Sequence, residues 1–195
     1  MKTDVARFSR FGELPTNELP ADIKEIYDKN HEKIGFVPNV FRAYSRRPEH
    51  FRAFMHYLDV LMRGESGLSR AEREAVVVAV SSENRCQYCV TSHGAALRIL
   101  SKDPVLADQI AINWRTANLS TRWRAMLGFA SRVNEPEFSA DDDEIAAMRT
   151  AGFSDDDIWD IAAIAGFFGF SNRMAGVMDM RPNPEFHQMG RKELP

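Results

Sequence analysis

The stretch that decides the fold is residues 69–93, SRAEREAVVVAVSSENRCQYCVTSH. It begins with Ser69 and Glu72, whose spacing is that of a capping box, a pair of side chains that opens a helix. The valine-rich run at residues 76–80 has strand propensity, but the cap and the length of the segment favour a helix over residues 69–82. Because the run is apolar almost throughout, we expect this helix to be buried on nearly every side.

A second helix is predicted from about Cys86 to Ser101, after a polar break at residues 81–85. Apolar residues spaced three to four positions apart predict more helices on both sides of this pair. They are expected at about residues 21–33 with Gly35 as the cap, from Pro48 to Met62, from Asp103-Pro104, from Ser120 to Val133, from the acidic run at 141–144, from Ser154 to Phe168, and from Phe170 to Met180. The sequence shows no alternating apolar strands and no βαβ rhythm, so the predicted fold class is all-α.

The sequence contains a faint internal echo. Leu68-Ser69 followed by Glu72 resembles Phe153-Ser154 followed by Asp157. Each copy leads into an apolar helix and then into a further predicted helix. This pattern raises an internal helical duplication as a possibility without deciding it.

Length and composition are those of one soluble domain. A chain of 195 residues is long enough to bury its own core. The fractions of hydrophobic residues (44%) and charged residues (27%) are typical of globular proteins. We therefore expect a single domain over residues 1–195, with an N-terminal extension of about 1–20 and a Pro-rich tail of about 181–195 that are both irregular.

Charge and hydropathy exclude several classes of partner. The net charge of -3 indicates no nucleic acid, and the one basic cluster, Arg42, Arg46 and Arg47, is typical of a solvated helix face. No segment approaches the ~20 apolar residues that span a bilayer, and the N-terminus lacks the apolar core of a signal peptide. We expect a cytoplasmic protein with no membrane partner, in a compartment where thiols stay reduced.

The two cysteines of the chain carry the strongest chemical signal. Cys86 and Cys89 have a spacing that chance would produce roughly 1% of the time. On a helix that begins near Cys86, both cysteines share one stripe with His93. The positive end of a helix stabilises a thiolate, a neighbouring histidine can take the thiol proton, and a second thiol can resolve a sulfenic acid into a disulfide. The pattern predicts dithiol redox chemistry.

Two other interpretations compete with redox chemistry. A zinc ion could be held by Cys86, Cys89 and His93 with a carboxylate, although a structural zinc site usually recruits a distant second pair of ligands, which this chain lacks. Alternatively, the cysteines are small buried side chains and the histidine is a satisfied core residue.

Three carboxylates on the preceding helix are candidates to orient His93 or accept its proton. They are Glu72, Glu74 and Glu83, and helical periodicity alone does not choose between them. Glu74 adjoins the valine run, where a charge is costly unless it is paired.

These residues resemble the signature of a known family. Glu74, eleven residues, Cys86-Gln87-Tyr88-Cys89, three residues and His93 are similar to the signature of the alkylhydroperoxidase D-like (AhpD-like) proteins, within the carboxymuconolactone decarboxylase superfamily. Further similarity, to the longer peroxidase-related branch, lies in residues 35–41 (GFVPNVF) with Arg47-Pro48, and in residues 170–175 (FSNRMA). The likeness touches most of residues 30–180.

The resemblance implies an AhpD-like helical fold in a homo-oligomer (trimer, dimer or hexamer). It also implies reduction of organic hydroperoxides with no metal, haem, flavin or other cofactor. By this likeness Cys89 attacks the peroxide, and Cys86 donates a proton and then closes the disulfide. Glu74 and His93 form the proton relay, and a dithiol or lipoyl-type molecule is the expected reductant.

Tyr88 and Glu83 are secondary candidates for the site. Tyr88 stands where the best-known members of the family have a histidine, and a tyrosine hydroxyl, with a pKa of about 10, is a poor base at neutral pH. The predicted function is a cofactor-free thiol peroxidase or dithiol–disulfide oxidoreductase. The alternatives are a redox sensor or interaction module that uses the dithiol as a switch, and a lactone decarboxylase, whose acid–base chemistry needs no dithiol.

Overall fold

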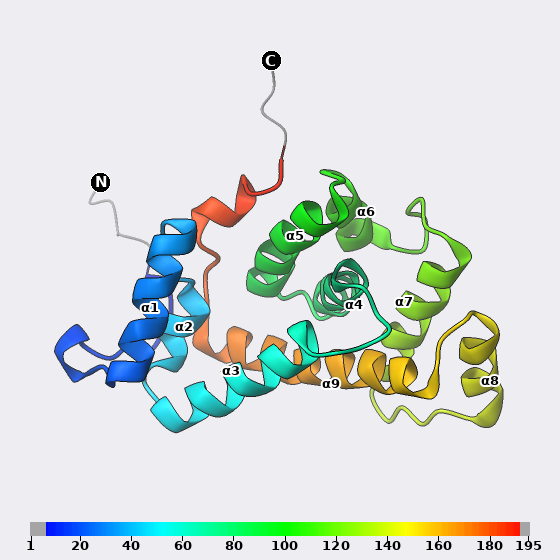
Figure 1. The fold of residues 1–195 in the computed structure, drawn as a ribbon, viewed down its shortest axis with the longest axis horizontal. Helices are drawn as coiled ribbons and strands as arrows, with labels where there is room; N and C mark the ends of the chain where they lie inside the picture. Colours follow the sequence, from blue (N-terminus) through cyan, green and yellow to red (C-terminus); the bar gives the residue numbers. More distant parts are fainter. Residues whose placement is uncertain (1–6, 192–195) are drawn as a thin grey trace, which may run out of the picture.

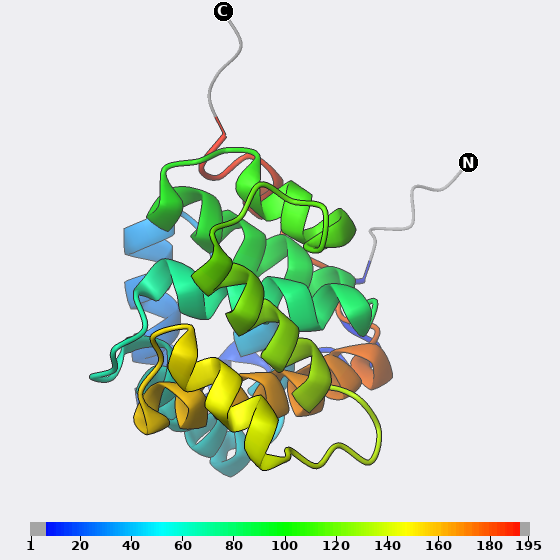
Figure 2. The same cartoon turned by 90° about the vertical axis from the view of Figure 1, so that its right-hand side faces the viewer.

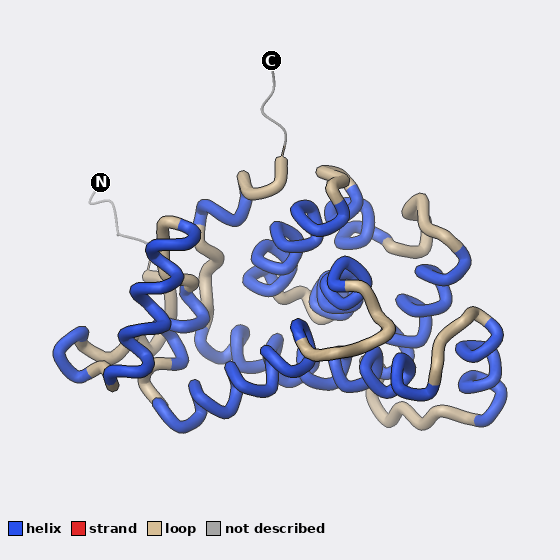
Figure 3. Tube along the Cα trace, viewed as in Figure 1, coloured by secondary structure: helices blue, strands red, loops and turns tan. Residues whose placement is uncertain are grey.

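The computed structural model describes residues 7–191, and this part of the chain consists of helices joined by loops, with no strand (Figures 1 and 3). Its elements are η1 (Thr16–Glu18), α1 (Ala21–Ile34), α2 (Asn39–Tyr44), α3 (Pro48–Arg63), α4 (Arg70–Glu83), α5 (Gln87–Ser101), α6 (Leu106–Asn113), α7 (Thr121–Val133), α8 (Asp142–Thr150), α9 (Asp155–Met178) and η2 (Pro184–His187). The predicted all-α class is confirmed.

Helix α4 is the centre of the fold. Figure 1 looks nearly along its axis, with α5, α6, α7 and α9 around it, and α9 runs beneath it both there and in the turned view of Figure 2. The four valines at residues 76–78 and 80 are 0% exposed, and Ala79 among them is 1% exposed. Burial of each valine side chain stabilises the fold by about 1.5–3 kcal/mol, which outweighs the strand propensity of the run.

The capping box that opens α4 is confirmed. The Glu72 N–H donates to Ser69 Oγ at 3.2 Å, and the Ser69 N–H donates to Glu72 Oε2 at 2.8 Å. Ser154 and Asp157 make the same reciprocal pair at the start of α9. The similarity between the two segments therefore holds for the caps. It does not extend further, because α4 is followed by the α-helix α5, whereas α9 is followed by no α-helix in the described range.

The prediction of two helices separated at Gly169 is wrong, because α9 is one continuous helix of 24 residues. A glycine inside a helix costs about 1 kcal/mol, and the packing of α9 against α4 and α7 offsets that cost. The length and composition of α9 are also sufficient to cross a membrane, with a mean hydropathy of 1.3 over 18 residues, of which 56% are buried in the fold. The expectation that no segment approaches the length of a membrane-spanning helix was therefore wrong. In this fold, more than half of the apolar stretch of α9 is buried against the rest of the protein.

The start of α6 also differs from the prediction. The helix begins at Leu106 rather than at Asp103-Pro104. Asp103 Oδ1 accepts hydrogen bonds from the N–H groups of Val105 (2.9 Å) and Leu106 (3.2 Å). Asp103 thus closes a turn that precedes the helix, whose own N-cap residue is Val105, so both the predicted cap and the predicted start of this helix were wrong.

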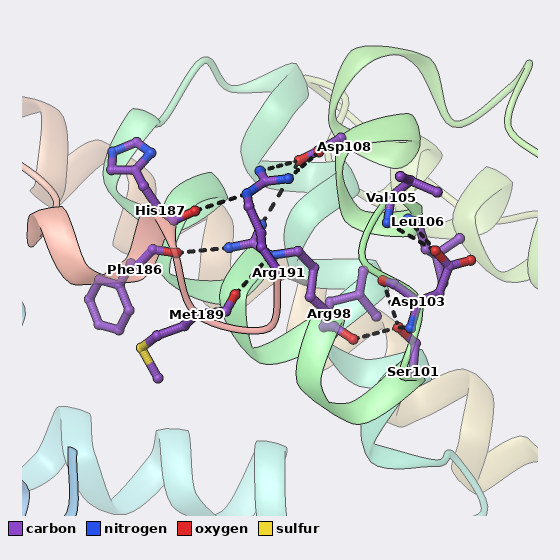
Figure 4. A network of polar contacts seen from close by, with 11 residues as sticks. Arg98, Ser101, Asp103, Val105, Leu106, Asp108, Phe186, His187, Met189 and Arg191 are labelled. Atoms are coloured by element: carbon purple, nitrogen blue, oxygen red, sulfur yellow. Dashed lines mark hydrogen bonds and ion pairs between the residues drawn. The ribbon is translucent and has the colours of Figure 1, made fainter. Parts of the chain in front are cut away.

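The N-terminal segment is largely irregular from residue 7 to the start of α1, apart from η1, as expected. The described part of the tail, residues 181–191, is likewise irregular apart from η2, but it is held against α5 (Figure 4). Buried Arg98 of α5 donates to the carbonyl oxygens of Phe186 (2.8 Å) and Met189 (2.9 Å), and Arg191 pairs with Asp108. The remaining parts of both predictions, residues 1–6 and 192–195, lie outside the described residues.

Candidate active site

The junction between α4 and α5 brings the dithiol into the core. Arg85 adopts a left-handed backbone conformation with φ of 56°, which turns the chain from one helix to the next. Cys86 is the N-cap residue of α5, and its N–H donates to the Ser81 carbonyl of α4 at 2.9 Å. Cys89 follows within the first turn, as the spacing of the two cysteines predicted.

The two thiols are free, buried and electrostatically unequal. Cys86 is 8% exposed and Cys89 is 3% exposed. A hydrogen bond with the Cys89 thiol, helped by the Cys89 N–H and the Asn172 side chain, lowers the pKa of Cys86 to about 7 against the opposing effect of burial. The same hydrogen bond, together with burial, raises the pKa of Cys89. The first of the two thiol protons therefore leaves near neutral pH.

His93 and Glu74 form a hydrogen-bonded pair beside the thiols. His93 Nδ1 lies 2.7 Å from Glu74 Oε2, and their side chains are only 20% and 12% exposed. The Phe168 ring of α9 packs edge-on against the imidazole, with centroids 4.7 Å apart. A carboxylate on one ring nitrogen fixes the orientation of the imidazole and leaves the other nitrogen for chemistry.

The structure distinguishes the three carboxylates that helical periodicity left open, and it agrees with the resemblance, which assigned Glu74. Glu72 is occupied by the capping box and by Arg122, whose Nε donates to it at 3.0 Å. Glu83 accepts from Trp114 Nε1 at 3.2 Å and from the Ser131 hydroxyl. Only Glu74 among these three hydrogen-bonds His93 in the described part of the chain.

Tyr88 has a structural contact that accounts for its burial. Its hydroxyl oxygen accepts a hydrogen bond from the Val40 N–H at 3.1 Å, which joins α5 to α2. Burial raises the pKa of Tyr88, so its hydroxyl stays protonated at neutral pH. It is therefore unsuited to act as a base.

Asn172 of α9 is a residue that sequence reasoning did not identify as part of the site. Its amide donates to Ser81 Oγ at 3.0 Å and accepts from Asn84 Nδ2 at 2.9 Å. Its side chain also acts to lower the pKa of both thiols, although the pKa of Cys89 is raised overall. It lies in the 170–175 segment that resembled the family, which was the available signal, but periodicity could not place that segment beside the cysteines.

The thiols line two different cavities. Cys89, His93 and Glu74 lie on an apolar cavity of about 180 Å³, whose wall includes Phe186 of the tail. A wider cavity of about 330 Å³ shares His93 and Glu74 with it and continues toward Arg63.

Cys86 lies instead on a separate cavity of about 190 Å³, which also contains Asn172. This cavity has a mainly polar lining, which includes Arg85 and Arg181. Tyr88 is part of the walls of both the apolar and the polar cavity and separates them.

The zinc alternative finds no support in the geometry. Within residues 7–191, no group of three His, Cys, Asp or Glu side chains is close enough to hold a metal ion. Glu74, the carboxylate nearest the histidine, is directed to a ring nitrogen rather than to a shared centre with the sulfurs.

Comparison with known proteins agrees with this fold. The model of the carboxymuconolactone decarboxylase family matches residues 48–132, a range that contains both cysteines, His93 and Glu74. No curated protein matches the chain.

Solved structures extend the match over almost the whole chain. An uncharacterized peroxidase-related protein from Ralstonia eutropha JMP134, described as an alkylhydroperoxidase AhpD core, is 48% identical over 95% of this chain and 97% of its own, with a TM-score of 0.92. A peroxidase-related protein from Silicibacter sp. TM1040 is 40% identical over 98% of this chain and 100% of its own, with a TM-score of 0.90. The debrominase Bmp8, at 18% identity over 92% of this chain and 95% of its own, shares the fold with a TM-score of 0.74. The chain belongs to the carboxymuconolactone decarboxylase family, in its alkylhydroperoxidase D-like branch.

Proposed function

We propose that this protein is a cofactor-free thiol peroxidase that reduces organic hydroperoxides through Cys86 and Cys89. The observation that carries the proposal is the apolar cavity, which holds the Cys89 thiol together with the His93–Glu74 pair. An apolar cavity favours an alkyl hydroperoxide over water and gives it access to one sulfur only.

In the first step, Cys89 attacks the outer oxygen of the peroxide. The Cys86 thiolate, which already accepts the Cys89 hydrogen bond, takes the Cys89 proton as the nucleophile forms. The O–O bond breaks, Cys89 becomes a sulfenic acid, and the alkoxide leaves. His93, held by Glu74, supplies the proton that converts the alkoxide into an alcohol.

In the second step, the two thiols form a disulfide. Cys86 loses its proton again, and its sulfur attacks the sulfur of the Cys89 sulfenic acid. Hydroxide leaves and is protonated to water. The balance is one hydroperoxide and two thiols converted into one alcohol, one water and one disulfide.

Other parts of the prediction remain proposals. A dithiol or lipoyl-type reductant returns the disulfide to the dithiol, and the protein acts in the cytoplasm, where such reductants are maintained. A homo-oligomer is expected, and light scattering on the purified chain tests it.

The test of the function is a count of free thiols after exposure of the reduced protein to cumene hydroperoxide. We expect both thiols to be lost and one cumyl alcohol to form for each pair. A count that stays at two contradicts the proposal. Repeated turnover with an added dithiol distinguishes an enzyme from a redox switch, which would be oxidised once without rapid cycling.

Two variants test the assignment of the sulfurs. Cys86→Ser should still be oxidised once, giving a sulfenic acid that dimedone labels, whereas Cys89→Ser should lose rapid reaction with the peroxide. The reverse outcome would exchange the roles. A Cys86→Ser, Cys89→Ser double variant with unchanged activity on a lactone would favour lactone decarboxylation instead.

A further inference from the structure

The cavity at Cys86 is not used by the peroxide chemistry proposed above. It has a volume of about 190 Å³ and is lined by the N-terminal turn of α5 and the C-terminal part of α9. Cys86 lines it, whereas Cys89 does not. A molecule in this cavity therefore reaches the first sulfur of the pair and not the second.

The charges around this cavity favour an anion. Arg85 and Arg181 are part of its lining, and Asp179 is its one acidic residue. Asp179 already pairs with Arg181 at 2.9 Å and with Arg7, which lies outside the lining, at 3.3 Å, so its negative charge is matched by two arginines and the charge of Arg85 is left over. The start of α5 adds the positive end of a helix dipole.

Arg85 has the most available charge of this group. Its side chain is exposed and makes no hydrogen bond or ion pair with any residue in the range 7–191. It immediately precedes Cys86 and shares the cavity with that thiol. The guanidinium can therefore bind an incoming carboxylate without first losing an existing partner.

We infer that this cavity is the docking site of the reductant, and that the reductant is a small thiol or dithiol carrying a carboxylate that Arg85 and Arg181 recognise. The inference rests on the proposed function, because it assigns the half-reaction that regenerates the dithiol. The peroxide then reaches the dithiol, and the reductant reaches the disulfide, through separate cavities.

The exchange balances as follows for a dithiol reductant. A reductant thiolate attacks Cys86 Sγ, the Cys86–Cys89 bond breaks, and Cys89 leaves as a thiolate that is protonated in its own cavity, where His93 lies. The second thiolate of the reductant attacks the sulfur of its own half of the mixed disulfide. Cys86 is released, and the reductant leaves as a cyclic disulfide that has given up two electrons and two protons.

The test uses dihydrolipoate and dihydrolipoamide, which share the same two thiols and differ in a carboxylate against a neutral amide. The protein disulfide is prepared with diamide, so the assay does not depend on reaction with peroxide. If peroxide fails to oxidise the protein, the proposed function fails, and this measurement still reads the docking site. Rates are divided by those of each reagent with 2-hydroxyethyl disulfide, which removes differences in intrinsic thiol reactivity.

We expect dihydrolipoate to reduce the protein about fivefold faster than dihydrolipoamide at low salt, and the ratio to fall toward one at 1 M salt because screening is then nearly complete. The combination Arg85→Asn with Arg181→Gln should bring the low-salt ratio to about one, and Arg85→Lys should keep most of it. Asn is chosen because it tolerates the left-handed backbone at this position.

The matched control is Arg63→Gln, which removes a positive charge from the wider cavity on the peroxide side. It should leave the dihydrolipoate preference unchanged. A ratio of one or below in the unmodified protein would overturn the inference and favour a neutral lipoyl group. An undiminished ratio in the double variant would also overturn it. The salt dependence of the unmodified protein provides a readout that does not rely on any variant.

Discussion

Cys89 and Cys86 lie less than one helical turn apart, yet their surroundings are opposite in character. Cys89 is 3% exposed, its pKa is raised, and it lines an apolar cavity with His93. Cys86 is 8% exposed, its pKa is lowered to about 7, and it lines a polar cavity with Arg85. The difference arises because the chain turns into α5 at Cys86, so the first sulfur lies at the rim of the helix and the second inside the core.

This comparison teaches that one CxxC pair can present two chemically distinct sulfurs. The hydrogen bond between the two thiols lowers the pKa of Cys86 and raises the pKa of Cys89. Each of the two cavities gives access to one of the sulfurs. In the proposed cycle, the peroxide reaches the dithiol and the reductant reaches the disulfide without competing for one entrance.

The largest expected effect comes from replacing His93 or Glu74, which line the apolar cavity beside Cys89. In the proposed mechanism, His93→Gln removes the group that supplies the proton, and Glu74→Gln removes the charge that orients the imidazole. We expect the second-order rate constant for oxidation by cumene hydroperoxide to fall about 100-fold for His93→Gln and at least tenfold for Glu74→Gln. Stopped-flow fluorescence or a thiol count over time measures it.

Glu83→Gln is the matched control, because Glu83 lies on the same helix but contacts Trp114 and Ser131 instead of the histidine. Its oxidation rate should stay within about twofold of the unmodified protein, since its carboxylate hydrogen-bonds Trp114 and Ser131 and makes no contact with the histidine in the described residues. Equal losses in Glu74→Gln and Glu83→Gln would show that the relay has no specific role.

The second effect concerns how the reactivity of Cys86, which lines the polar cavity, depends on pH. Since the pKa of Cys86 is lowered to about 7, its thiolate is present above that pH and is lost as pH falls below it. We expect alkylation of the reduced protein by iodoacetamide to level off above about pH 7 and to drop about tenfold per pH unit below it. Quenched samples analysed by peptide mass spectrometry assign the modified cysteine.

Cys89→Ala should sharpen this comparison. It removes the thiol hydrogen bond that is the main cause of the lowered pKa of Cys86, so the midpoint should move to higher pH and alkylation at pH 7 should slow about tenfold. Cys89→Ser keeps a hydroxyl donor and should shift less. A midpoint that is the same in all three proteins would mean that the sulfur pair is not coupled.

A smaller effect is expected from Asn172, which contacts both sulfurs. Asn172→Ala should slow peroxide oxidation about threefold and raise the alkylation midpoint of Cys86, because one hydrogen bond to the thiolate is lost. Asn134→Ala is the control, since Asn134 bonds to Asn84 in the same amide cluster and is not among the groups that shift either thiol. If both variants behave alike, the role of Asn172 is structural only.

The smallest effect on the rate of peroxide oxidation is expected from Tyr88, which lines both cavities. Tyr88→Phe removes the acceptor of the Val40 N–H, so the free energy of unfolding in urea should fall by about 1 kcal/mol. The rate of peroxide oxidation should remain within about twofold. A tenfold slower reaction with unchanged stability would assign Tyr88 a chemical role.

Much of the fold could be predicted from local patterns. The capping boxes at Ser69 and Ser154, the cap at Gly35 and the proline at the start of α3 all lie where the sequence placed them. Local rules were wrong at Gly169, because a buried helix tolerates a glycine when packing on its other residues compensates for it. They also missed the anchoring of the tail by Arg98, which depends on contacts with residues about 90 positions away.

By itself, the sequence determined the all-helical class and the alignment of Cys86, Cys89 and His93 along one helix, because periodicity and spacing are local properties. Helical periodicity did not choose among Glu72, Glu74 and Glu83, and only the family resemblance singled out Glu74; the packing of α4 against α5 is what brings that carboxylate to the histidine. Tertiary structure also brought Asn172 to the sulfurs and placed them on separate cavities. Those outcomes depend on how distant helices pack, and no spacing along one helix encodes that packing.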